Sequence, residues 1–271
     1  TKVWAETNDL YDVQPTTQTL NTGTAVLNDT KLVTATTFHV FTTGNDAAKT
    51  NNTSPLFTVG YSTPTKLQVI LPGETAVPGK PPYDNNTGGK TGTPGISQGG
   101  GMKGFVAGSG FYITIHACDE QWNKINSNPA GGNPNIKITS KDPQFNLPQD
   151  TGQLNLGFKE LNISNGLWTA WSTNTLCASD IGVTDGYDYL PSTSSEVRIY
   201  PSAAAYMAFS QVPSAAVAGS PIYPRLTVYD KFGNVCSTGP NVYTNSVIFS
   251  VPAEEMFTGK QAPSIPANIT F

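Results

Sequence analysis

The sequence predicts an all-β chain made of tandem β-sandwich modules, one complete and flanked by two partial ones. The first observation is a repeat, because Ile113–Asn123 and Leu226–Asn234 each read as an alternating strand that runs into an Asp-x-x-x-Asn turn. The second is that another strand-like segment follows each turn, at Asn135–Asp142 and at Asn245–Val251. Strand, turn and strand recurring at a period of about a hundred residues is typical of tandem sandwich modules.

Composition agrees with this fold class. Charged residues make up 13% of the 271 residues, against about 25% in an average soluble domain. Their place is taken by Thr, which favours strands, and by Gly, Pro and Asn, which favour turns. No apolar run approaches the length of about 20 residues of a membrane helix, so membrane insertion is not expected. The net charge of −4 and the scattered basic residues argue against a nucleic-acid partner.

The complete module is expected over residues 66–195. It begins with a strand, continues through a Gly/Pro-rich excursion at 72–104, and then alternates short strands with Gly, Pro and Asn turns. The strands expected in this module are Lys66–Leu71, Phe111–Ala117, Ile136–Ser140, Gln153–Phe158, Leu167–Thr173 and Val183–Leu190.

Residues 196–271 restart the pattern as the amino-terminal strands of a further module. Glu196–Tyr200 matches the first strand, Pro224–Tyr229 the second and Val247–Val251 the third, and Ile269–Phe271 falls in a middle strand.

Residues 1–65 are expected to be the carboxy-terminal strands of a preceding module. Lys2–Thr7 resembles Ile136–Ser140, Phe38–Thr42 resembles Trp168–Ser172, and Pro55–Tyr61 leads into the next module.

An open sandwich would leave its core and edges bare. Two explanations are open: the sequence is a window on a longer polypeptide, which we favour, or a neighbouring chain supplies the missing strands. The two partial modules overlap in their middle strands. The chain starts at Thr1 with nothing like a signal peptide, so we expect a mature protein or an excised piece of one.

Three segments carry a resemblance to a known family: Leu71–Gly79, Gly89–Pro94 and the strand ending in Asp119–Asn123. Together they resemble the tandem Ig-like repeats of bacterial surface proteins, of the invasin/intimin type. The resemblance implies Ig-like sandwiches and an extracellular or cell-surface setting, and it carries no catalytic residue.

The three cysteines suggest a disulfide in such a sandwich. The turn after the second strand and the turn between the last two strands lie at the same end, so Cys118 and Cys177 are expected to form a disulfide. Cys236 would then pair in a late turn of the next module. Unpaired buried thiols are the alternative. No C-x-x-C pair is present, so zinc is not expected.

Other motifs give weaker signals. Sequons in long polar loops make Asn52 and Asn85 candidate glycosylation sites. Asp180, Asp185 and Asp188 could bind Ca²⁺, although such loops are usually plain turns; no other cofactor is expected. Gly88–Thr91 lacks the spacing of a phosphate-binding loop.

The aromatic residues suggest a repeated contact surface. Aligning Phe38–Phe41 with Trp168–Trp171 places Phe38 and Trp168 on one strand face, expected in the core. Phe41 and Trp171 then lie on the outer face and are candidate interface residues, unless loop insertions cover them.

Two functions follow. The first is a structural segment of an extracellular fibre, sheath or surface layer, whose partners are copies of itself or neighbouring modules. The alternative is an adhesin or carbohydrate-binding stalk that grips a glycan or host protein through aromatics such as Trp4, Tyr83 and Trp122. An enzyme is not expected, because His39 and His116 lie in separate modules without a nucleophile beside them.

Overall fold

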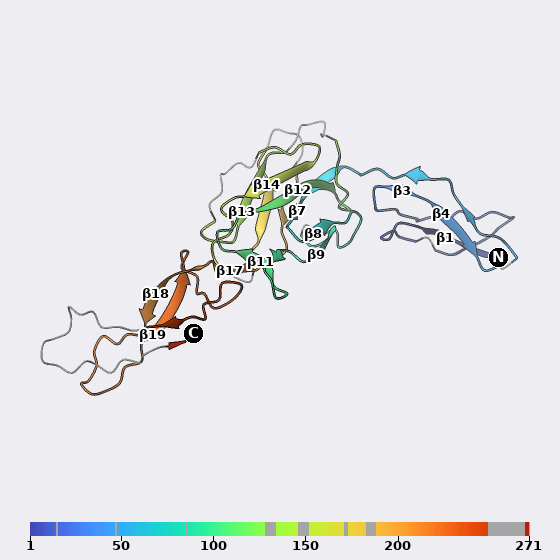
Figure 1. Ribbon diagram of the computed structural model, residues 1–271. Coiled ribbons are helices and arrows are strands. Elements are labelled where there is room, and N and C mark those ends of the chain that lie inside the picture. The colour runs from blue at the N-terminus through green and yellow to red at the C-terminus, as the bar shows by residue number, and fades with distance from the viewer. Residues whose placement is uncertain are drawn as a thin grey trace. The chain divides into compact units, whose positions relative to one another are not determined.

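The protein is all-β, as the sequence predicts. A computed structural model describes residues 1–14, 16–46, 48–84, 86–127, 134–145, 152–170, 173–182, 188–248 and 269–270, and every regular element in these ranges is a strand (Figure 1). The described ranges hold no helix long and apolar enough to cross a membrane.

The chain forms two compact units. One comprises Thr1–Ser97 with Lys103–Ile199, and the other comprises Gln98–Met102 with Tyr200–Phe271. The predicted boundary at 195/196 lies four residues from the observed one at 199/200, whereas residues 1–65 belong to the same unit as the central module. The three-part division therefore stays a prediction.

The larger unit contains a series of short strands and ends within β17 (Ile199–Tyr200). In chain order they are β1 (Lys2–Thr7), β2 (Gln18–Thr19), β3 (Thr37–Phe38), β4 (Val40–Gly44), β5 (Asn52–Thr53), β6 (Phe57–Thr58), β7 (Pro64–Ile70), β8 (Glu74–Ala76), β9 (Lys90–Gly92), β10 (Ile96–Ser97), β11 (Lys103–Val106), β12 (Phe111–Asp119), β13 (Ile136–Ser140), β14 (Phe158–Ile163), β15 (Leu176–Asp180) and β16 (Ser192–Thr193). The second unit has β18 (Ala204–Ser210), β19 (Arg225–Asp230), β20 (Ser246–Val247) and β21 (Ile269–Thr270).

The central module is a sandwich of two three-stranded sheets. One sheet has the order β14-β12-β7 and the other β13-β15-β16, and β7 contacts both β15 and β16 (Figure 1). Because side chains alternate along a strand, Leu67 and Val69 of β7 point into the core with Ile115 of β12, and all three have no exposed surface.

The opposite face of β7 and β12 is polar but also covered. Lys66 donates from Nζ to the carbonyls of Tyr83 and Asp84, at 3.3 and 3.1 Å, and its Nζ lies 3.5 Å from the centre of the Trp122 ring. Gln68 on the same face donates to the carbonyl of Gly89 at 2.8 Å. The excursion at 72–104 therefore folds back over this face, and burial lowers the pKa of Lys66.

Two predicted strands of the module are wrong. Residues 153–158 end in a turn, and the strand begins at Phe158 instead. Within the predicted strand Leu167–Thr173, the described residues 167–170 are not in a strand, because the amides of Trp168 and Thr169 donate to the Asp142 carboxylate rather than to a neighbouring strand. Residues 183–187 of the predicted Val183–Leu190 strand lie outside the described ranges.

Residues 1–60 repeat the second half of the central module. Asp9 accepts hydrogen bonds from the amides of Val33 and Thr34 and from Thr34 Oγ1, at 2.8, 2.9 and 2.8 Å. Asp142 accepts the same three bonds from Trp168 and Thr169, at 2.6, 2.9 and 2.7 Å. This agrees with the predicted correspondence of Lys2–Thr7 with Ile136–Ser140, since each aspartate lies two residues beyond its strand.

A tight turn gives a second match between the two halves. Asn21 and Thr24 exchange backbone bonds of 2.8 and 3.0 Å, as Asn155 and Phe158 do at 2.9 and 3.0 Å. The two central residues of both turns have positive φ: 49° and 85° at Thr22–Gly23, and 49° and 66° at Leu156–Gly157. Such turns favour Gly at positions of positive φ, and both have Gly at the second central position. Because the two turns match, the strand β14 corresponds to residues that begin at Thr24.

We expect the buried carboxylates to make the fold sensitive to acid. Burial opposes ionisation of Asp142, but hydrogen bonds from Thr169, Gln144 and Trp168 outweigh it and lower its pKa below 3.8. Asp9 is lowered in the same way. Their contribution to stability is therefore complete above about pH 5 and is lost as the pH falls through 3.8 toward the lower folded-state pKa.

The replacement Asp142→Ala is expected to reduce the free energy of unfolding by about 3 kcal/mol at pH 7, because it leaves three amides and a hydroxyl without their acceptor. It should also flatten the dependence of stability on pH between about pH 5 and 3. Urea unfolding across this range checks both effects. The control is Glu160→Gln, at an exposed position of β14, and equal losses in the two variants would contradict the role of Asp142.

Candidate assembly site

The Asp-x-x-x-Asn turn of the central module is organised around one buried carboxylate. Asp119 accepts bonds from the amides of Gln121, Asn123 and Ser62, at 3.0, 2.9 and 2.9 Å. The side-chain amide of Asn123 also donates to it, at 3.0 and 3.2 Å. The aspartate therefore ties the end of β12 to the segment that enters β7.

The asparagine of this turn also binds residues 33–35. Asn123 Nδ2 donates to the carbonyl of Val33 at 2.9 Å, and the amide of Ala35 donates to Asn123 Oδ1 at 2.7 Å. These two bonds lie on either side of Thr34, whose hydroxyl donates to the Asp9 carboxylate. One side chain thus joins residues 1–60 to the central module by two bonds to the backbone.

Gly79 allows the excursion at 72–104 to approach both the Asp119–Asn123 turn and Thr34. The amide of Gly79 donates to the carbonyl of Gln121 at 2.9 Å. A Cβ added at Gly79 would lie 2.1 Å from Thr34 Oγ1, and its φ is +76°. Glycine is therefore required here for both its conformation and the close contact with Thr34.

The second unit repeats the turn. Asp230 accepts bonds from the amides of Phe232, Asn234 and Ser202 at 2.9, 2.8 and 2.8 Å, and from Asn234 Nδ2 at 2.9 Å. The residue before the asparagine has positive φ in both turns, 66° at Trp122 and 85° at Gly233. The predicted correspondence of the two Asp-x-x-x-Asn turns is therefore seen bond for bond.

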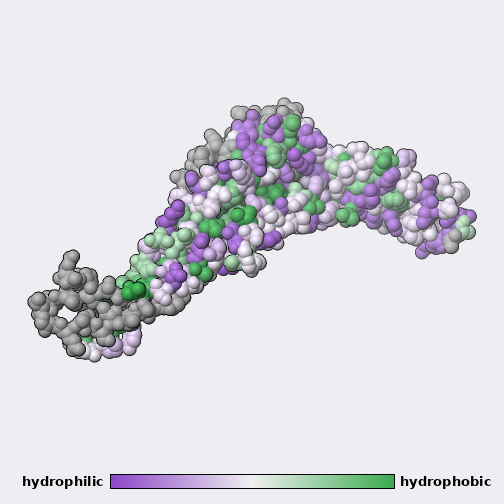
Figure 2. All heavy atoms as spheres, in the orientation of Figure 1, coloured by the Kyte–Doolittle hydropathy of each residue, from purple (hydrophilic) through white to green (hydrophobic). Residues whose placement is uncertain are grey.

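This correspondence shifts one predicted alignment. Counting from the serines, β7 corresponds to β18 rather than to Glu196–Tyr200, because the amides of Ser62 and Ser202 donate to Asp119 and Asp230 in the same way. Leu67 and Val69 then correspond to Met207 and Phe209. The former pair is fully buried, whereas Met207 is 41% and Phe209 55% exposed. Figure 2 shows apolar, green surface over β18 and β19.

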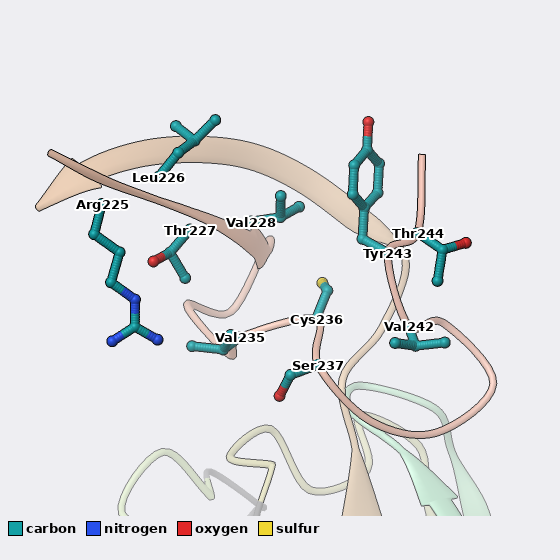
Figure 3. A pocket seen from close by; sticks show the side chains of 10 residues that line it. All are labelled: Arg225, Leu226, Thr227, Val228, Val235, Cys236, Ser237, Val242, Tyr243 and Thr244. Atoms are coloured by element: carbon teal, nitrogen blue, oxygen red, sulfur yellow. The ribbon is translucent and has the colours of Figure 1, made fainter. Parts of the chain in front are cut away.

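A groove of about 330 Å³ lies along β19. Figure 3 shows Cys236 in it between Val235 and Val242, with its sulfur directed toward the strand that carries Val228. The amide of Cys236 donates to the carbonyl of Val228 at 3.0 Å, as Ile125 does to Ala117 in the central module. The groove therefore corresponds to the region around Ala117 and Ile125.

The predicted Cys118–Cys177 disulfide is wrong, since all three cysteines are free thiols. The prediction placed both residues in turns at one end of the sandwich. Instead Cys118 lies within β12 and Cys177 within β15, in different sheets. Cys118 Sγ is 3.9 Å from Gln68 Oε1, whereas Cys177 Sγ is near the carbonyl of Ala178. Cys236 corresponds to Ile125, a core position, rather than to Cys118.

The predicted aromatic alignment is also wrong. The aspartate anchors match Val33–Thr34 with Trp168–Thr169, so Phe38–Phe41 does not correspond to Trp168–Trp171. Phe41 is 37% exposed on β4 and pairs with Thr53. Trp171 lies outside the described residues. Phe38 is buried, as expected, whereas Trp168 is only half-buried.

The aromatics considered for sugar stacking do not share one environment. Trp122 is only 2% exposed, because Lys66 covers its ring and its Nε1 donates to the carbonyl of Pro82 at 2.8 Å. Trp4 is half-buried and donates to Glu6, and Tyr83 donates to the carbonyl of Gly79. The structure therefore gives no sugar platform at Trp122.

The remaining candidates are dispersed. Asn52 is exposed on β5, and Asn85 lies outside the described residues. Asp180 accepts a bond from the amide of Gly182, Asp188 is exposed, and Asp185 is not described. Within the described ranges no three His, Cys, Asp or Glu residues gather as metal ligands.

His116 lies within β12, whereas His39 lies between β3 and β4. Burial, with a smaller effect of Lys124, lowers the pKa of His116 to about 4, so this side chain is neutral at pH 7. Its Nδ1 lies 3.3 Å from Gln68 Oε1. His39 Nδ1 lies 2.9 Å from the carbonyl of Ser54.

Known proteins show only weak structural similarity to this chain. No known protein-family profile and no curated sequence matches the chain. Solved structures with weak similarity include β-glucuronidase 3 of Bacteroides uniformis (10% identity, TM-score 0.29, covering 72% of this chain and 21% of that one). Two others are Parabacteroides merdae β-glucuronidases, at 10% and 9% identity and TM-scores of 0.28 and 0.25, covering 73% and 71% of this chain and 20% of each enzyme. The chain spans about a fifth of their length.

The aspartate anchors were missed at the level of sequence, although a signal is present. Val33-Thr-Ala35 and Trp168-Thr-Ala170 share their last two residues, and each lies a similar distance beyond an aspartate. The turns Asn21-Thr-Gly23 and Asn155-Leu-Gly157 also match. Both signals are short polar motifs in loops. The alignment of Phe38–Phe41 with Trp168–Trp171 was based on apolar residues instead, and so it did not use them.

We expect the thiols to differ in reactivity. Burial, with the charge of Asp119, raises the pKa of Cys118, and burial, with the charge of Asp230, raises that of Cys236. Cys177 is half-exposed and should react first with a thiol reagent in the native protein. Mass spectrometry of alkylated peptides, without reductant, measures this. Three reactive thiols are expected after unfolding, and only one would contradict the free state of Cys118 and Cys177.

Removing the Asn123 side chain should loosen the junction. Asn123→Ala deprives the Ala35 amide of its acceptor, so hydrogen exchange at Ala35 is expected to accelerate at least tenfold. Asn8→Ala is a matched control, because Asn8 accepts the amide of His39 and should affect exchange there and not at Ala35. Unchanged protection of Ala35 in Asn123→Ala would show that this side chain does not hold the junction.

Proposed function

We propose that this chain is a non-catalytic structural segment of an extracellular fibre, sheath or surface layer assembled from tandem Ig-like modules. The observation that carries the proposal is the recurrence of hydrogen-bonded anchors along the chain. Asp9 and Asp142 form one set of bonds, and Asp119 and Asp230 form another. Anchors that recur in order are typical of repeat proteins, in which each module contacts its neighbours.

The junction supports this proposal in a second way. Asn123 binds the backbone on both sides of Thr34, so the junction is held by two directional bonds rather than by chain connectivity alone. The residues that flank it are fixed in turn by Asp9 and Asp119. Such a joint restricts the orientation of successive modules, which a fibre or sheath requires. The partners are then neighbouring modules or further copies of the chain.

A binding role remains the second candidate, on one observation. Tyr206 and Tyr229 stack with ring centroids 5.3 Å apart, and Tyr206 is half-exposed. They occupy the positions of Lys66 and Cys118, which the excursion at 72–104 covers in the central module. A stacked aromatic pair with one exposed and one partly buried ring is a suitable platform for a sugar ring, which favours an adhesin or a carbohydrate-binding stalk.

Immunogold electron microscopy of the cells that make the protein tests the structural role. Antibody raised against the 271-residue chain is expected to label extracellular filaments or a continuous surface layer. Label confined to the cell interior would overturn the proposal. Dispersed surface label, together with glycan-array binding that Tyr206→Ala abolishes and Tyr223→Ala spares, would favour the binding role instead.

A further inference from the structure

One of the four aspartate anchors precedes a proline, because the residue after Asp142 is Pro143. The other three anchors precede residues with an ordinary peptide nitrogen: Leu10, Glu120 and Lys231. Asp142–Pro143 is also the only Asp–Pro bond in the sequence. The bond before proline is a tertiary amide, and its nitrogen leaves more readily on protonation than that of an ordinary peptide bond. An aspartate can therefore cut this bond by attacking its own main-chain carbonyl carbon.

The reaction needs no partner other than water. One carboxyl oxygen of Asp142 bonds to the main-chain carbonyl carbon of the same residue, and the bond from that carbon to the Pro143 nitrogen breaks. The carboxyl proton passes to this nitrogen, and the cyclic anhydride that remains takes up one water molecule to give a carboxy-terminal aspartate. Because the carboxyl group supplies the proton, its neutral form is the reactive one. The products are residues 1–142 and 143–271.

In the structure both carboxylate oxygens of Asp142 are occupied. Oδ2 accepts the amides of Trp168 and Thr169, at 2.6 and 2.9 Å. Oδ1 accepts the hydroxyl of Thr169 at 2.7 Å and the amide of Gln144 at 3.0 Å. Whichever oxygen attacks must first break two of these bonds. The hydrogen bonds that anchor the loop at Trp168–Thr169 therefore also oppose cleavage.

The same bonds keep the carboxyl group in its unreactive, ionised form. Burial alone would raise the pKa of Asp142, but hydrogen bonds from Thr169, Gln144 and Trp168 lower it below 3.8. These donors are uncharged, Asp142 forms no ion pair in the part of the chain that the structure describes, and the neighbouring Lys141 is exposed. Near pH 3.8 the carboxyl group is therefore half protonated in an unfolded chain and mainly ionised in the folded one.

We propose that the Asp142–Pro143 bond is a latent self-cleavage site: the hydrogen bonds to the Asp142 carboxylate keep it intact, and their loss allows the chain to cut itself there. This inference goes beyond the structural role and does not depend on it. The cut falls between β13 and β15, which pair from Ile136↔Asp180 to Ser140↔Leu176. Because these pairs join the two sides of the cut, cleavage removes the covalent connection and leaves the strand pairing available.

Incubation of the whole chain at about pH 4, with and without urea, tests the protection. Mass spectrometry identifies the fragments. Residues 1–142 and 143–271 are expected to appear at least about tenfold faster in urea, because unfolding removes the donors and raises the neutral fraction of the carboxyl group. Pro143→Leu, which gives Asp142 the type of neighbour that Asp9 has, should yield neither fragment. Equal rates with and without urea, or an unfolded wild-type chain that stays intact, would overturn the proposal.

Two matched variants separate the anchor from general instability. Thr169→Val removes the hydroxyl bond to Asp142, and Thr34→Val removes the same bond from Asp9, which precedes a leucine. Without urea, Thr169→Val is expected to release the fragments about tenfold faster than the wild type, as fits the loss of one charge-assisted hydrogen bond. Thr34→Val should leave the rate at 142–143 unchanged. Equal acceleration in both variants, or none in Thr169→Val, would show that the anchor does not control this bond.

Discussion

The structure depends on buried carboxylates that accept several backbone amides at the ends of strands. Asp142 holds the loop at Trp168–Thr169 against the end of β13, and Asp119 holds the entry to β7 against the end of β12. A buried amide without an acceptor is costly, and an ionised carboxylate satisfies several at once through charged hydrogen bonds. The sheets of the module are short, so these anchors fix the connections that the sheets alone leave open.

The aspartate and the asparagine of the Asp-x-x-x-Asn turn bind different segments of the chain. Asp119 binds the turn itself and Ser62, in the segment that enters β7, whereas Asn123 binds Val33 and Ala35. Asparagine suits the contacts with Val33 and Ala35 because its side chain has both a donor and an acceptor. It can therefore bond a carbonyl and an amide of the same extended segment, which a carboxylate cannot do.

Much of the fold could be predicted from the sequence, because strand periodicity and turn residues are local signals. The strands Lys2–Thr7 and Ile136–Ser140 have the predicted first and last residues.

The errors arose where a group that is distant in the sequence determines the local structure. The loop at Trp168–Thr169 reads as a strand by its composition, but Asp142, 26 residues away, takes its amides. The predicted disulfide failed for a related reason, since spacing alone does not reveal that Cys118 and Cys177 lie within strands of different sheets. For the candidate site, the turns at Asp119 and Asp230 were recognised, but their bonding to other segments requires coordinates.

The exposed face of β18 follows from the same repeat. Met207 occupies the place of Leu67, which β15 and β16 cover in the complete module. Burying a side chain of this size is worth about 2 kcal/mol, so the exposure of Met207 in the described part of the second unit forgoes part of that energy. The anchors at Asp230 and Ser202 explain why this half still holds its turn, because those bonds lie within one half of the sandwich. The anchors at Asp9 likewise lie within the other half. Each of these two portions is therefore organised by its own carboxylate.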